Sequence, residues 1–283
     1  MRKVGLLLTI CLILAAAPAD AQRLFGTIGM GGGAYTSSTL VELDPTTGAV
    51  VATIGDVGYL INGMAWEYST ATLWATTSAH DPTFPSGLLT INPASAAGTP
   101  IGTGFGLGSG SCVLTAVNST GQVYSWWDPS QDDLIVFDTV TGLATRVGES
   151  GTGTATHSIA FDAADVLWMV DNTIYTVDTT TGAVTNTGNS IGMSLHHGQF
   201  NPTTGLFYGV DGAYGPGARN IAVVDVATGS VVDTIPSVDD LHTLAWVEGT
   251  FVRPGIPAVS PWGAGLMALL VIVCGALVLR RYV

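Results

Sequence analysis

The chain has few basic residues and few cysteines. It carries 8 Lys and Arg against 21 Asp and Glu, which gives a net charge of −13. Because such an acidic surface repels phosphate groups, the composition argues against nucleic-acid binding. Of the 3 cysteines, two lie in hydrophobic terminal stretches. Only Cys112 remains between those stretches, so we expect no intramolecular disulfide there and a small buried side chain at this position.

Amphipathic helices are also missing from the long middle of the chain, between Gln22 and Pro254. Short apolar runs alternate there with Gly, Thr and Ser, and Val, Ile, Leu and aromatic residues recur in these runs. This pattern indicates short strands rather than disorder. We therefore expect an all-β domain, and about 230 residues provide ample material for a core.

The N-terminus has the order of a secretory signal. A basic start precedes an apolar stretch from Val4 to Ala17, and Ala19 and Ala21 offer a small-residue cleavage site. This order predicts a signal peptide over residues 1–21. We therefore expect the rest of the chain to be exported.

The C-terminus contains a second hydrophobic stretch. Trp262 to Leu279 carries no charge and would be about 27 Å long as a helix at ~1.5 Å per residue. That length nearly matches a hydrocarbon core of about 30 Å. Arg280 and Arg281 would remain on the cytoplasmic side, because arginine is disfavoured at mid-membrane. We expect a transmembrane helix with its Arg cluster over residues 264–283, held in the inner membrane.

A short motif precedes this helix, and its residues match a known pattern. The matching residues are Ile256, Pro257, Ser260, Trp262 and Gly263. Together with the helix and the Arg pair, they resemble the IPTL-CTERM sorting domain, a relative of the PEP-CTERM signals read by exosortases. Ala258 and Val259 depart from the Thr and Leu of that family. The alternative is a plain C-terminal anchor with Trp262 at the membrane interface.

The resemblance implies a location and two partners. An exosortase-type protease or transferase would read the tail, with or without removing the helix. Such tails go with bacteria that make extracellular polysaccharide. The resemblance therefore implies a protein anchored in the membrane and then delivered to the cell surface or the extracellular matrix.

The middle of the chain contains a repeat of about 45 residues. Its first motif is an apolar run ending in Asp or Asn, and the five copies end at Asp44, Asn92, Asp138, Asp178 and Asp225. Four copies reach a Gly four residues later, whereas the second has a looser turn that runs to Gly98. Asp can bond its own backbone two residues on and Gly supplies a positive φ, so the motif predicts a tight hairpin.

A second motif lies between these hairpins. It is another apolar run, and its five copies begin at Asn62, Val113, His157, His197 and His242. In the first four copies a turn and a further strand follow, so each unit holds four short strands. Four-stranded units repeated radially are typical of a β-propeller.

The two ends of the repeat complement each other. The last unit has only its first strand, Leu241 to Val247, and the first unit begins at Arg23 with a strand that fits the second position. We expect these strands to complete one blade of a five-bladed propeller, which would remove an exposed sheet edge. The propeller domain covers residues 22–250, and a linker with the sorting motif covers residues 251–263. The repeat resembles YncE-like and quinoprotein-like propellers, without an enzyme-specific motif of those families.

Polar residues at the start of the inner strands form one candidate site. Asn62, His157, His197 and His242 would come from four consecutive blades, and the three imidazoles could hold a divalent metal. The alternative is a structural role in which each side chain caps the strand start. His196 would point to the opposite side from His197 in a regular strand. No catalytic residue and no firm cofactor is predicted.

Two further sites have weaker patterns. Trp126 and Trp127 are consecutive, so one must face away from the interior of its blade and could stack on carbohydrate; the alternative is a core position. The acidic segment from Asp128 to Asp133 and the pair Asp162 and Asp165 could bind Ca²⁺, but both lack the spacing of a calcium loop.

These observations favour an exported envelope protein whose propeller is a non-catalytic binding or scaffolding domain. The rival is a metal-assisted polysaccharide lyase or hydrolase with its site in the channel of the propeller. A propeller can host either kind of function, so the fold alone does not choose between them.

The sorting hypothesis predicts the behaviour of tail variants. Replacing Trp262 and Gly263 with Ala, or Arg280 and Arg281 with Gln, should change the share of protein found at the cell surface, because each pair belongs to the recognised tail. Cell fractionation measures that share, with Val252→Ala in the linker as control. Equal fractionation of all variants and the wild type would contradict a recognised tail.

Overall fold

The computed structural model describes residues 22–29, 36–108, 110–128, 133–152, 158–212 and 217–248. The predicted signal peptide, the sorting motif and the C-terminal helix lie outside these ranges, as does His157. No helix among the described residues has the length and apolar character needed to cross a membrane.

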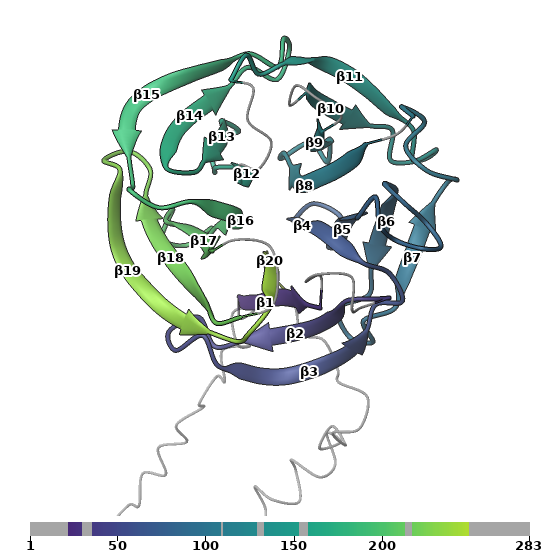
Figure 1. Ribbon diagram of the computed structural model, residues 1–283, viewed down its shortest axis with the longest axis horizontal. Helices are drawn as coiled ribbons and strands as arrows, with labels where there is room; N and C mark the ends of the chain where they lie inside the picture. The colour runs from purple at the N-terminus through teal and green to yellow at the C-terminus, as the bar shows by residue number, and fades with distance from the viewer. Residues whose placement is uncertain are drawn as a thin grey trace, which may run out of the picture.

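The described residues form five antiparallel sheets of four strands, set radially around one axis (Figure 1). The first blade contains β20 (Leu241–Val247), β1 (Arg23–Ile28), β2 (Thr39–Leu43) and β3 (Val50–Asp56). The second contains β4 (Ile61–Glu67), β5 (Thr72–Thr77), β6 (Leu88–Ile91) and β7 (Gly98–Ile101). The third contains β8 (Ser111–Val117), β9 (Val123–Asp128), β10 (Asp133–Phe137) and β11 (Ala144–Glu149). The fourth contains β12 (Ser158–Phe161), β13 (Leu167–Val170), β14 (Thr173–Val177) and β15 (Val184–Ser190). The fifth contains β16 (Leu195–Phe200), β17 (Phe207–Asp211), β18 (Arg219–Asp225) and β19 (Ser230–Ser237). The prediction of a five-bladed propeller is confirmed.

The first blade is completed by the two ends of the repeat, as expected. Strand β20 pairs antiparallel with β1, from Arg23 opposite Val247 to Ile28 opposite Leu241. The hydroxyl oxygens of Thr27 and Thr243 lie 2.7 Å apart in this pairing. Beyond the strands, Gln22 Nε2 donates to Glu248 Oε1 at 3.2 Å. The ring is therefore closed by hydrogen bonds between residues more than 200 positions apart.

Apolar side chains fill the spaces between neighbouring blades. One such cluster joins the first and fifth blades through Leu24, Val41, Ile221 and Leu244. An inner strand has a neighbour on both faces, so all seven residues of β4 are buried. The outermost strand β3 is mostly exposed. Burial on both faces explains why the inner strands read as continuous apolar runs rather than alternating ones.

The Asp/Asn hairpin turns lock each blade to the one before it. In the third blade, Asp138 Oδ1 accepts the amide of Val140 at 2.8 Å, which caps the turn. These turn hydrogen bonds lower the pKa of Asp138. Gly142 closes the turn at φ +75° and packs directly against β7 of the second blade, where a Cβ on it would overlap the carbonyl oxygen of Ile101. The repeated Gly therefore permits both a left-handed turn and a close approach between blades.

The second blade uses the same turn without glycine. The amide of Ala96 donates to Asn92 O at 2.8 Å, as Gly142 donates to Asp138 O, and Ala96 takes φ +65°. The expectation of a looser turn running to Gly98 is therefore wrong. The residue of β3 that faces Ala96 is Gly55, and even a Cβ built on Gly55 would lie 3.5 Å from the Cβ of Ala96, an ordinary van der Waals distance.

This comparison predicts opposite effects for two substitutions. Gly142→Ala should lower the stability by about 2 kcal/mol or more, because a left-handed Ala costs about 1–2 kcal/mol before any clash is counted. Ala96→Gly should be neutral or slightly stabilising, because it relieves the same strain. Denaturant unfolding of both variants checks this. An unchanged stability for Gly142→Ala would contradict the close approach between the blades.

Candidate functional site

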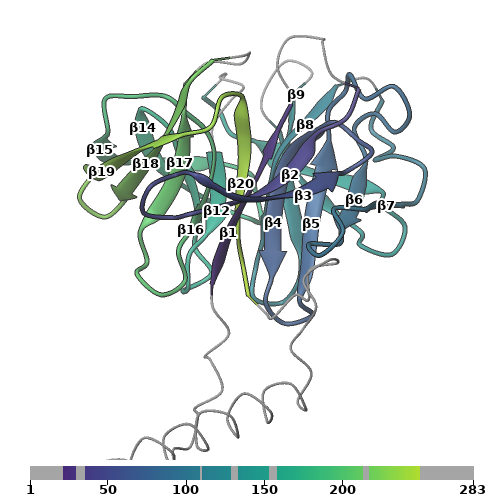
Figure 2. The same ribbon diagram turned by 90° about the horizontal axis from the view of Figure 1, so that it is seen from below.

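The five inner strands give the ring two distinct faces. We call the side at which these strands begin the start face and the side at which they finish the end face. Figure 2 shows β4 pointing toward the side where β1 starts and β20 finishes. The described chain therefore begins at Gln22 and stops at Glu248 on the end face.

The channel between the inner strands is crossed by polar side chains. His197 is 1% exposed, with its Nε2 3.1 Å from the amide of Met64 and its Nδ1 3.0 Å from the amide of Leu244. Gln199 Nε2 donates to the carbonyls of Met64 at 3.0 Å and Thr115 at 3.1 Å. A neutral imidazole accepts at only one ring nitrogen, so His197 gives a partner to one of these two amides, while Gln199 gives donors to both carbonyls on the free edges of the inner strands. The channel is thus a cross-linked core.

Toward the start face, Asn62 connects three blades. Its Oδ1 lies 3.1 Å from His242 Nε2, and its Nδ2 donates to Cys112 O at 2.8 Å and to Ser111 Oγ at 3.2 Å. The Cys112 side chain is buried, as expected, and burial raises the pKa of its thiol. These contacts match the structural alternative weighed for the strand-start residues.

The structure corrects the alignment of the histidines. The pairing register shifts between Ile61 and Gly63 in β4 and between Leu195 and His197 in β16. Asn62 and His196 are therefore the extra, unpaired residues at equivalent bulges of β4 and β16. His197 corresponds to Gly63. The prediction that His197 shares the position of Asn62 and His242 is wrong by one residue, because a bulge adds a residue that spacing alone does not reveal.

The two described channel histidines are neutral near pH 7. Burial, followed by the neighbouring His242, lowers the pKa of His197 to about 3. Burial, followed by His196 and Arg219, lowers the pKa of His242 to about 3. Both ring nitrogens of His197 face backbone amides, so neither points to an open coordination position. Among the described residues, no three His, Cys, Asp or Glu side chains are grouped so as to hold a metal.

Trp126 and Trp127 lie on opposite faces of the third blade, as two consecutive strand residues must. Trp126 is 2% exposed in the core shared with the fourth blade. Trp127 packs toward the second blade, where its ring is 6.3 Å from that of Phe105 in an edge-on contact. Each face of the third blade packs against a neighbouring blade, so both indoles contact protein. Neither indole forms an open stacking surface.

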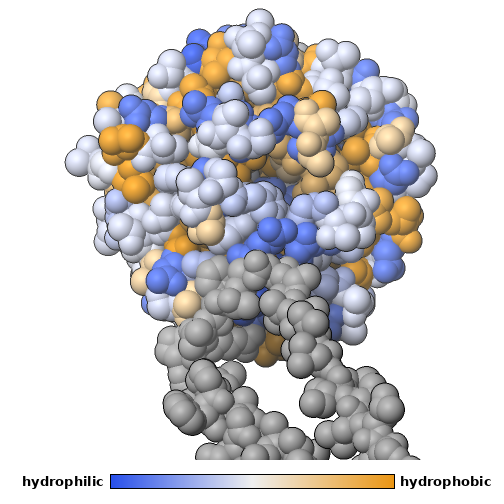
Figure 3. Space-filling view, turned by 180° about the vertical axis from the view of Figure 1, so that it is seen from behind, coloured by the Kyte–Doolittle hydropathy of each residue, from blue (hydrophilic) through white to orange (hydrophobic). Residues whose placement is uncertain are grey.

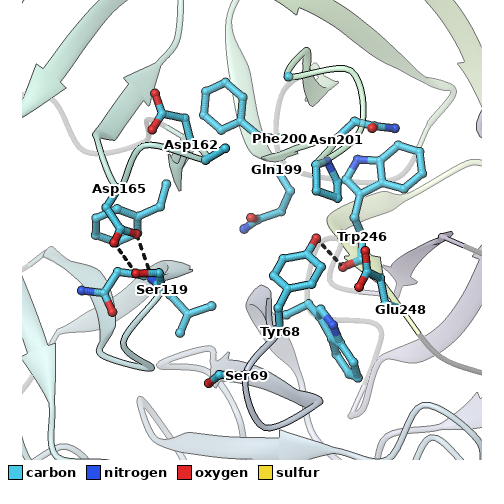
Figure 4. A pocket seen from close by; sticks show the side chains of 17 residues that line it. Tyr68, Ser69, Ser119, Asp162, Asp165, Gln199, Phe200, Asn201, Trp246 and Glu248 are labelled. Atoms are coloured by element: carbon cyan, nitrogen blue, oxygen red, sulfur yellow. Dashed lines mark hydrogen bonds between the residues drawn. The ribbon is translucent and has the colours of Figure 1, made fainter. Parts of the chain in front are cut away.

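A cavity of about 500 Å³ opens in the middle of the end face. We call it the bowl. Figure 3 looks onto this face and shows the hollow at its centre. Its aromatic wall consists of Trp66, Tyr68, Phe161, Phe200 and Trp246. Four of these residues lie at or near the last position of an inner strand. The radial arrangement of the inner strands therefore brings them together (Figure 4).

Three carboxylates stand around this aromatic wall: Asp162, Asp165 and Glu248. Asp162 Oδ1 accepts the amides of Ala164 and Val166, and its Oδ2 accepts Trp168 Nε1, each at 2.8–2.9 Å. Asp165 accepts the Ser119 amide at 2.8 Å and also the Ser119 hydroxyl, as drawn in Figure 4. The carboxylates are therefore held in place by turns and by neighbouring blades.

Tyr68 is the most accessible aromatic residue of the bowl, at 47% exposure. Its hydroxyl oxygen lies 3.5 Å from Trp246 O. Burial of the hydroxyl end, together with the negative charge of Glu248, raises the pKa of this phenol. Beneath the wall, the pKa of Glu67 is lowered. Burial alone would raise this pKa, but hydrogen bonds from Trp74, Ser69 and Thr70 together outweigh that effect.

The sequence predicts a candidate site near the strand starts, whereas the cavity lies where the inner strands finish. Trp66 and Trp246 line this cavity although they are only 4% and 3% exposed. A usable signal was present, because three of the inner strands finish in an aromatic residue followed directly by Glu, Asp or Asn (Trp66, Phe161 and Phe200).

The other acidic segment contributes to folding. Asp133 is buried and pairs with Arg146 Nε at 2.7 Å. Residues 129–132 lie outside the described ranges. The Asp162 and Asp165 pair lines the bowl, and both carboxylates accept hydrogen bonds from protein donors.

Comparison with known proteins shows likeness at the level of the fold. No known family model and no curated protein matches the chain. A chain from the crystal structure of a nidogen/laminin complex aligns over 80% of this chain and 98% of its own length, with 13% identity and a TM-score of 0.52. A gluconolactonase from Xanthomonas campestris aligns over 81% and 84%, with 12% identity and a TM-score of 0.48. A protein of unknown function from Bacteroides caccae aligns over 81% and 100%, with 9% identity and a TM-score of 0.46.

The channel histidines predict a pH-dependent stability. Their folded pKa is about 3, below the ordinary 6.5, so the stability is complete above pH 6.5 and is lost as the pH falls from there toward 3. Two such groups give a slope of at most about 2.7 kcal/mol per pH unit. Urea unfolding between pH 5 and 6 measures this slope.

The matched variant is His242→Gln, which keeps a hydrogen-bonding side chain that does not titrate. It should reduce the contribution of the two rings to the slope by about half. His80→Gln serves as the control. The same slope in wild type and His242→Gln would show that His242 is not held neutral by the fold.

Proposed function

We propose that this protein is an exported cell-envelope protein whose propeller binds a ligand at the end-face bowl without catalysing a reaction. The observation that carries the proposal is an aromatic-walled cavity formed where the inner strands finish. Concave sites with aromatic walls and a few placed polar groups are typical of ligand binding. Export by a signal peptide and sorting through an IPTL-CTERM-like tail remain part of the proposal.

The chemistry of the bowl supports binding over catalysis. No His, Lys, Arg or Cys occurs among its described lining residues, so its serines have no imidazole or amine base there. The carboxylate that accepts the Ser119 hydroxyl, Asp165, also accepts the Ser119 amide and so holds a turn in place. Asp162 already accepts three hydrogen bonds. A general acid or base needs a carboxyl group that can reach the reacting atom, and this carboxylate caps a turn instead.

The position of the bowl fits an anchored protein. Glu248 lines the bowl and is the last described residue, so the segment leading to the expected membrane helix starts at its rim. With that helix in the inner membrane, the bowl would face the membrane side. Release by an exosortase-type enzyme would then expose the bowl to extracellular polysaccharide.

The proposal predicts binding without turnover. Full-length protein in a polyoxyethylene detergent should co-sediment saturably with extracellular polysaccharide from the producing cells, and no new reducing or unsaturated sugar ends should form. Tyr68→Ala should weaken binding roughly tenfold, because exposed aromatic anchors dominate such contacts. Leu143→Ala, exposed on the turn between β10 and β11, is the matched control.

The rival function gives a different result in the same assay. A metal-assisted lyase or hydrolase would produce new ends, and it would contain stoichiometric metal that is lost in His157→Ala, His197→Ala and His242→Ala. Metal analysis and circular dichroism of these variants separate metal loss from unfolding. Turnover that depends on these histidines would overturn the non-catalytic proposal.

A further inference from the structure

The ionisable side chains among the described residues that line the bowl are all acids or the phenol of Tyr68. Asp162, Asp165 and Glu248 stand at the cavity, and no described lining residue is positively charged. The nearby Arg23 is engaged elsewhere, with its Nη2 2.6 Å from Glu42 Oε2. A cleft with charges of one sign focuses the field into its interior, so this cavity attracts cations.

The aromatic wall suits a particular kind of cation. The faces of Trp, Tyr and Phe rings attract ammonium and guanidinium groups through the ring quadrupole. This chain uses the same interaction elsewhere, since the guanidinium carbon of Arg23 lies 4.8 Å from the ring centre of Phe25. A bare metal ion would find few open oxygen ligands in the wall, because Asp162 and Asp165 already accept protein hydrogen bonds.

The floor of the bowl also offers an acceptor. The amide nitrogen of Gln199 donates to two carbonyls across the channel, at 3.0 and 3.1 Å. This fixes the side chain at the centre of the cavity, where Figure 4 shows it between the aromatic rings. With both N–H groups used, Gln199 has its carbonyl oxygen left to accept a hydrogen bond from an N–H or O–H group of a ligand.

We propose that the bowl binds an organic cation, namely an ammonium group on a small carbon skeleton. The inference rests on the proposed binding function and specifies that the ligand carries a positive charge. Neutral sugars also stack on aromatic rings, but they give no reason for three carboxylates in a lining whose described residues carry no positive charge. The ammonium group can belong to a free amine or to an amino sugar of a polysaccharide.

A pair of isosteric probes tests the charge. Choline and 3,3-dimethylbutan-1-ol have the same shape, but only choline is charged. Titration of the full-length protein in polyoxyethylene detergent, followed by tryptophan fluorescence and calorimetry, should show choline binding roughly tenfold more tightly. Glucosamine compared with N-acetylglucosamine separates the sources, because only glucosamine carries the ammonium group on a sugar.

Variants assign the effect to the bowl. Asp165→Asn keeps a residue type that tolerates the φ of +60° at this position, and Glu248→Gln keeps the shape of the side chain. Each should weaken choline binding roughly three- to tenfold and leave the neutral isostere unchanged. Asp138→Asn is the matched control, because it removes one charge from a distant turn that Asn92 forms equally well in the second blade.

The outcomes are distinct. Preference for choline and glucosamine, weakened by the two bowl variants only, supports the inference. Equal binding of choline and its neutral isostere would overturn the charge requirement but leave ligand binding at the bowl intact. If no amine probe binds, the inference that the bowl binds an organic cation is also overturned. If Tyr68→Ala also leaves polysaccharide binding unchanged, the proposed function itself fails.

Discussion

The pairing of β20 with β1 is the constraint on which the rest of the structure depends. A blade in the ring is stabilised on both faces by its neighbours, and a gap would expose the apolar faces of two blades at once. The chain closes this gap with backbone hydrogen bonds along the whole of β1 and with the contact between Thr27 and Thr243. Because the closing partners are the two ends of the repeat, every other blade depends on their meeting.

Closure forces the inner strands together and makes the channel a packed region. Five inner strands present free backbone edges to one narrow space, and these edges need partners. His197 and Gln199 supply them from β16, and Asn62 joins three blades nearer the start face. The described residues of the expected metal site, Asn62, His197 and His242, therefore act as cross-links, and the two buried imidazoles remain neutral. At the end face the strands finish and the turns spread apart, which leaves room for a cavity.

The bowl is a consequence of the repeat. Trp66, Phe161, Phe200 and Trp246 lie at or near the finish of four of the five inner strands, and all four line the bowl. The acidic or amide residue that follows in three of these copies caps the next turn, so it places a polar group beside an aromatic one. The repeat thereby supplies the aromatic wall and Asp162, and Asp165 and Glu248 complete the negative rim.

The strands, four of the five Asp/Asn hairpin turns, the number of blades and the closing strand could be predicted from the sequence, because they follow from local periodicity and from the complementary ends of the repeat. It could not place the histidines, since the bulge at Asn62 and His196 shifts the register by one residue without changing the pattern. It also could not show that Trp126 and Trp127 both face neighbouring blades. The end at which the channel opens could not be predicted from the sequence. That depends on how side chains from five blades fill one shared space, and no single repeat contains this information.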